Sequence, residues 1–138
     1  MITDWKKKDL WSRRSNKFCV EVSRHTVTQS STDPYEGVNR WAVYAYIYPE
    51  HRSFASFSGD SMFQDAACCL PLHGGPSYLR IHLDESGENI TCYQVGADYH
   101  HLHDDRFADY ENESDAASVF FDADELFNWL SDDAEVAQ

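Results

Sequence analysis

The alternation of side chains between residues 40 and 48 constrains the fold more than any other stretch of this chain. Successive side chains of a β-strand point to opposite faces of a sheet, so a period of two predicts a strand here. Large side chains occupy both faces, and we therefore expect a central strand that is covered on both sides. One face carries Trp41, Val43, Ala45 and Ile47, and the other carries Ala42, Tyr44, Tyr46 and Tyr48.

Three further stretches alternate in a similar way, at residues 17–28, 78–83 and 90–99. The last two flank a turn-forming segment at residues 84–88, which is typical of an antiparallel hairpin. Residues 114–130 repeat apolar side chains at helical spacing and predict an amphipathic helix. Together these elements predict an α+β fold, an antiparallel sheet of four to five strands with the C-terminal helix packed on one face. The apolar stripe of that helix consists of Ala116, Val119, Phe120, Ala123, Phe127 and Leu130.

The length of 138 residues is that of one ordinary domain, so we expect a single domain over residues 1–138. Residues 1–16 are basic and predict an N-terminal arm or a short helix, while residues 131–138 predict a frayed acidic tail. The chain has no C-x-x-C spacing, which favours free thiols over a disulfide or a metal site. The four cysteines are Cys19, Cys68, Cys69 and Cys92.

Charge is distributed unevenly along the chain. Residues 1–80 hold ten Lys and Arg against eight Asp and Glu, a net charge of +2. Residues 81–138 hold sixteen acidic residues against a single cation, Arg106, a net charge of −15. Phosphate binding needs Lys and Arg, so we expect no direct binding of nucleic acid, whereas a basic protein surface would be attracted. The acids expected to contact such a partner are Asp104, Asp105, Asp109, Glu111, Glu113, Asp115, Asp122 and Glu125.

A cluster of imidazoles and carboxylates follows the last predicted strand, one hairpin after a Gly-Gly turn. We expect His73, Asp98 and His101 to form a structural polar cluster, because buried polar groups at a strand end need hydrogen-bonding partners. His73 or the backbone of the turn would then donate to Asp98. An alternative is a metal site made of His73, Asp98, His101 and Asp104, which would serve a metal-dependent hydrolase with a bound water as nucleophile. No cofactor motif is present, and no cofactor is expected.

Three landmarks occur in order along residues 41–130. They are His73-Gly74-Gly75-x-Ser77-Tyr78, then Gly96-x-Asp98-x-x-His101-x-x-Asp104, then the amphipathic helix, with Trp41 and Tyr44 upstream. This order resembles small uncharacterised proteins of phages, prophages and plasmids, in which an HGG-[LI]-T-Y element precedes a G-F-D-C-A-H-x-G-D element. The chain departs from that pattern at Pro76, Ser77, Tyr99 and His103. The resemblance implies an origin in mobile elements and action in the cytoplasm of a host bacterium, without implying a reaction.

These observations lead to three hypotheses of function. The first is an acidic binding protein that mimics nucleic acid and inhibits a host nucleic-acid-binding or defence protein, such as one of restriction or CRISPR immunity. The second is the metal-dependent hydrolase. The third is a structural accessory module that forms a homodimer. No apolar run approaches the roughly 18 residues of a membrane helix, so none of the three involves a membrane.

Overall fold

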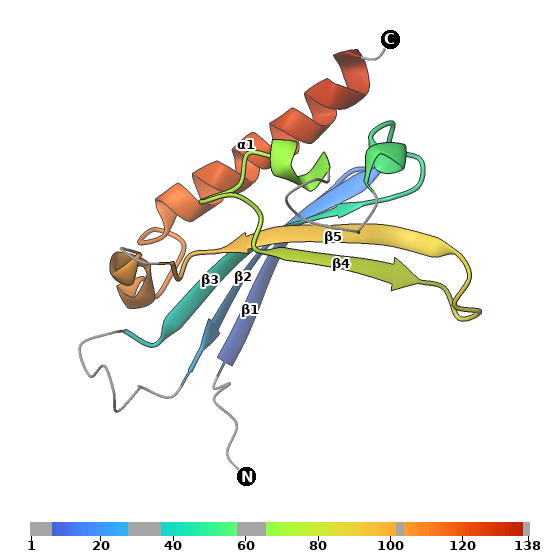
Figure 1. The fold of residues 1–138 in the computed structure, drawn as a ribbon. Coiled ribbons are helices and arrows are strands. Elements are labelled where there is room, and N and C mark those ends of the chain that lie inside the picture. The colour runs from blue at the N-terminus through green and yellow to red at the C-terminus, as the bar shows by residue number, and fades with distance from the viewer. Residues whose placement is uncertain (1–6, 28–36, 58–65, 102–103, 137–138) are drawn as a thin grey trace.

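The computed structural model describes residues 7–27, 37–57, 66–101 and 104–136, and within them the chain has an α+β fold (Figure 1). A five-stranded antiparallel sheet has the order β1-β2-β3-β5-β4, and one long helix packs against it. The predicted fold class is therefore confirmed, and β3 is the middle strand, as its alternation indicated. The elements are β1 (Lys7–Arg14), β2 (Phe18–Thr26), β3 (Asn39–Ile47), η1 (Phe54–Ser56), η2 (Ala66–Cys69), β4 (Tyr78–Leu83), β5 (Ile90–Asp98), η3 (Asp105–Asp109) and α1 (Ala117–Val136).

The first strand corrects the prediction of an N-terminal arm or short helix. β1 pairs with β2 along its whole length, with Trp11 opposite Val22. The Trp11 ring stacks on Trp41 at 5.6 Å between ring centroids, which gives the strand an apolar anchor. Arg13 and Arg14 are exposed on this edge, where charge discourages pairing with another chain. Residues 1–6 lie outside the described residues.

Helix α1 starts three residues later and ends six residues later than the sequence indicated, at Ala117 and Val136. The helix therefore extends into residues 131–136, which the sequence assigned to the tail. The stripe was partly right, since Val119 and Leu130 are fully buried. Leu126 is also fully buried, although the prediction omitted it, whereas Phe120 and Phe127 are only half-buried.

The core lies between α1 and one face of the sheet. Alternate residues of β2, β3 and β5 form the sheet side of this core. They lie opposite one another in the strand pairing, and alternate side chains of a strand point to the same face. Phe18 on β2 contacts Phe127 on α1, with ring centroids 4.9 Å apart. The buried apolar residues of the three strands on this face are Phe18, Val20, Val22, Trp41, Val43, Ala45, Ile47, Tyr93, Val95 and Ala97.

The opposite face of the sheet has no α-helix over it among the described residues, whereas the sequence predicted that both sides of β3 are covered. Tyr44 and Tyr46 are half-buried there, beside a hollow of about 240 Å³. Tyr44 lies directly over Gly96 on β5, where an added Cβ would come within 2.3 Å of the tyrosine ring. The Tyr44 side chain on this face therefore packs against the backbone of the neighbouring strand. In the described parts of the chain, no helix is long and apolar enough to cross a membrane.

Candidate functional site

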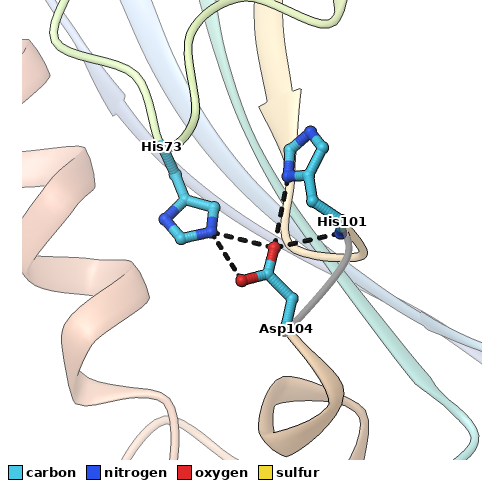
Figure 2. A group of neighbouring side chains, drawn as sticks. All are labelled: His73, His101 and Asp104. Carbon is cyan, nitrogen blue, oxygen red and sulfur yellow. Dashed lines mark hydrogen bonds and ion pairs between the residues drawn. The ribbon is translucent and has the colours of Figure 1, made fainter.

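Three side chains from two separate segments meet beside the end of β5 (Figure 2). His73 comes from the loop before β4, whereas His101 and Asp104 follow β5. The Nε2 atom of His73 lies 3.0 and 2.9 Å from the two carboxylate oxygens of Asp104. The backbone N–H of His101 donates to Oδ2 of Asp104 at 3.0 Å, and the Nδ1 atom of the same histidine lies 3.2 Å from that oxygen. The carboxylate is therefore the centre of the cluster.

Aromatic packing fixes the position of His73. Its ring stacks on Tyr99 with centroids 4.4 Å apart and planes 14° apart, and it meets the edge of Phe107 at 5.5 Å. The Tyr99 hydroxyl donates to Asp122 on α1 at 2.6 Å. Burial raises the pKa of Tyr99, and this hydrogen bond raises it further, so the phenol keeps its proton. The sheet and the helix thus both hold the ring that supports His73.

The turn before β4 allows the two histidines to approach each other. Gly74 has φ of +70°, a region that favours glycine, and Gly75 has φ of +83°. A Cβ on Gly74 would meet Cε1 of His101 at 3.4 Å, which is an ordinary van der Waals contact. The two glycines therefore serve the backbone conformation of the turn, which places Gly74 beside the His101 ring.

Asp104 is a buried carboxylate with 7% relative exposure. Burial acts to raise its pKa, but the hydrogen bonds from the His101 backbone and from His73 outweigh burial and hold the pKa below its usual range. Asp104 is therefore ionised at neutral pH. Its carbonyl accepts from the N–H of Phe107 and so begins η3, which ties the cluster to the following loop.

The structure brings the predicted histidines together, but around a different carboxylate from the one predicted. His73 and His101 meet as predicted, but Asp104 occupies the central position that the sequence assigned to Asp98. The Asp98 side chain is 51% exposed, and its Oδ1 lies 3.6 Å from Nε2 of His101. Its carboxylate accepts from the N–H of His100 at 3.0 Å. The structure does not support Asp104 as a partner-contacting acid, because the carboxylate is buried and already bonded.

Five of the eight predicted partner-contacting acids are exposed, and they lie on the segment before α1 and on its outer side. Glu113 accepts from the Trp11 indole N–H at 2.9 Å, and Asp115 accepts from the N–H of Glu111 at 3.1 Å. Asp122 is half-buried and bonded to Tyr99. Asp105 lies in η3, and its side chain is outside the described residues. The exposed acids are Asp109, Glu111, Glu113, Asp115 and Glu125.

Phe121 is a functional candidate that the helical spacing of apolar residues did not indicate. It is 61% exposed, more than any other exposed large apolar side chain in the described parts of the chain. It lines a hollow of about 400 Å³ with Pro71, Leu72, His73, Asp122 and Glu125. Phe121 follows Phe120 in the sequence but lies outside the apolar stripe of α1. A large apolar residue outside that stripe is the sequence feature that could have identified it.

A buried arginine fixes the segment that carries the acids. Arg24 is 5% exposed and forms an ion pair with Asp9 on β1. Its guanidinium also donates to the side chain of Asn39 and to the carbonyl of Glu111. The segment before α1 is therefore anchored to three strands of the sheet. Comparison with protein-family models, with curated proteins and with solved structures found no match for this chain.

Proposed function

We propose that this chain is a binding protein whose acidic face docks on a basic surface of a partner protein. The acidic face is the set Asp109, Glu111, Glu113, Asp115, Asp124 and Glu125, together with Phe121. One observation carries the proposal: the exposed Phe121 side chain lines a hollow with the carboxylates of Asp122 and Glu125, and the segment before α1 adds four exposed acids. Buried aromatic anchors within a polar rim supply most of the binding energy of many interfaces.

The charge of this region supports a cationic partner. Arg106 is the only Lys or Arg after residue 81, and its guanidinium lies over the Phe107 ring at 4.5 Å. Asp124 is 3.5 Å from Arg13, but both side chains are more than half exposed, so this pair contributes little. A face of one sign steers an oppositely charged partner toward it and raises the association rate.

The finer form of the proposal names the class of partner. Surfaces that bind a phosphate backbone are rich in Lys and Arg, so an acidic face can occupy them in place of nucleic acid. The resemblance to mobile-element proteins favours a host nucleic-acid-binding or defence protein in a bacterial cytoplasm. The protein would then act as an inhibitor that competes with nucleic acid.

Affinity capture with matched variants tests the proposal. The full-length protein is immobilised, and a bacterial lysate is passed over it at low and at high salt. One variant neutralises the face with Asp109→Asn, Glu111→Gln and Glu113→Gln. A control variant removes three charges elsewhere, with Glu50→Gln, Glu85→Gln and Glu88→Gln, all of which are exposed. A third variant is Phe121→Ser.

The proposal expects nucleic-acid-binding proteins to be captured at low salt by the wild type and by the control. Capture should fall with salt and be lost in the neutralised variant, because the attraction is electrostatic. Phe121→Ser should weaken capture without changing its salt dependence. Equal capture by the neutralised variant and the control would contradict the proposal.

A further inference from the structure

We infer that His73, His101 and Asp104 form a binding site for a divalent transition-metal ion, with Zn²⁺ as the best match. One ligand atom from each of the three residues lies within 4.8 Å of the others. Two imidazole nitrogens and one carboxylate oxygen are donors that Zn²⁺ accepts readily. None of its three residues belongs to the acidic face, and the site adjoins that face where His73 lines the same hollow as Phe121 and Glu125.

The spacing of the donors is close to what the ion requires. Bond lengths of roughly 2.0–2.1 Å in a tetrahedral site place ligand atoms about 3.3 Å apart. Nε2 of His73 lies 2.9 Å from Oδ2 of Asp104, and Nδ1 of His101 lies 3.2 Å from the same oxygen. The three ligand atoms lie within 4.8 Å of one another, so an ion fits after the two imidazoles close on each other by up to about 1.5 Å.

Exposure of the histidines leaves room for a further ligand. The side chains of His73 and His101 are 27% and 38% exposed, whereas that of Asp104 is 9% exposed. A site with three protein ligands and an open side keeps a water molecule in the fourth position. Asp104 is the fixed ligand, and the two histidines separate it from solvent.

Binding requires a rearrangement of ring protons that the structure can accommodate. In a neutral imidazole one ring nitrogen carries the hydrogen, and the ligating nitrogen must not. Loading the ion therefore leaves the proton of His101 on Nε2. Oδ1 of Asp98 lies 3.6 Å from that atom and accepts this proton in a hydrogen bond after a shift of about half an ångström. A carboxylate that accepts from the far nitrogen of a ligating histidine orients the ring and strengthens the ligand. This assigns Asp98 a positioning role outside the three ligands.

Titration of the metal-free, full-length protein with Zn²⁺ tests the inference. Isothermal calorimetry gives affinity and stoichiometry, and Co²⁺ in place of Zn²⁺ gives visible absorption that reports a tetrahedral site. The ligand variants are His73→Gln, His101→Gln and Asp104→Asn, and the positioning variant is Asp98→Asn. The matched control is His100→Gln, which removes an exposed imidazole one residue from the site.

The inference expects one ion per wild-type chain and loss of tight binding in each ligand variant. Asp98→Asn should weaken binding by about 10–100-fold, as outer partners of ligands do. Because a ligand variant can lose its fold, NMR of the wild-type imidazole nitrogens provides a second test. Shifts of the His73 and His101 resonances on Zn²⁺ addition are expected. Absence of saturable binding, unshifted resonances, or an equal loss in His100→Gln would overturn the inference.

Discussion

Removal of the Asp104 carboxylate should destabilise the metal-free protein far more than removal of Asp98. Asp104→Ala leaves the His101 N–H and two imidazoles without their acceptor. An unsatisfied buried donor costs about 1–3 kcal/mol, and a hydrogen bond to a charged group contributes about 1.5–3 kcal/mol. Water reaches both imidazoles, which are 27% and 38% exposed and so recover part of the loss. We therefore expect a decrease in the free energy of unfolding of about 2–4 kcal/mol in total.

Urea denaturation in the presence of a chelator measures this effect. With a slope of about 2 kcal/mol per molar urea, the midpoint should fall by about 1–2 M in Asp104→Ala. Asp98→Ala is the control, since its side chain is 51% exposed, and its midpoint should move by less than about 0.5 M, as for surface substitutions. An equal shift in the two variants, or a larger one in Asp98→Ala, would refute the placement of Asp104 at the centre of the cluster.

Three further outcomes are expected. Leu126→Ala should lower the free energy of unfolding by about 2–5 kcal/mol, because the side chain is fully buried, and thermal denaturation with Phe121→Ala as the exposed comparison checks this. The stability advantage of the wild type over Asp104→Asn should shrink as the pH falls through the depressed folded pKa of Asp104, which urea midpoints across the acid range would show. A thiol reagent should find four free cysteines in denaturant, whereas in the folded protein Cys19 should react more slowly than exposed Cys68, because burial shields its thiol and raises its pKa.

The fold could be predicted where alternation and helical spacing were unbroken, as in β3 and α1. β1 was missed because its apolar members are few and charges interrupt them, so the strand depends on pairing with β2 and on the stack of Trp11 against Trp41. Such tertiary contacts outweigh the secondary-structure preferences of the individual residues. They leave no alternation of apolar and polar residues in the sequence that would predict a strand.

The sequence predicted which residues form the site, but not which carboxylate lies at its centre. Asp98 and Asp104 each stand three residues from His101, so spacing alone cannot tell which carboxylate turns inward. The choice depends on where β5 ends and η3 begins, because these ends decide which carboxylate comes within hydrogen-bond distance of His73. Phe121 could not be predicted because helical spacing identifies the apolar residues that are buried and gives no sign of an apolar residue that is exposed.

Competition with nucleic acid tests the central claim, that the acidic face docks where a partner binds nucleic acid. The measurement is the fluorescence anisotropy of a labelled DNA duplex bound to the captured partner, while this protein is titrated in at about 50 mM and about 200 mM salt. We expect the wild type and the Glu50, Glu85, Glu88 control to release the duplex. The variant neutralised at Asp109, Glu111 and Glu113 should need at least about tenfold more protein, since each 1.4 kcal/mol of lost attraction is tenfold in affinity. Anisotropy that stays high while the partner binds this protein would contradict the claim.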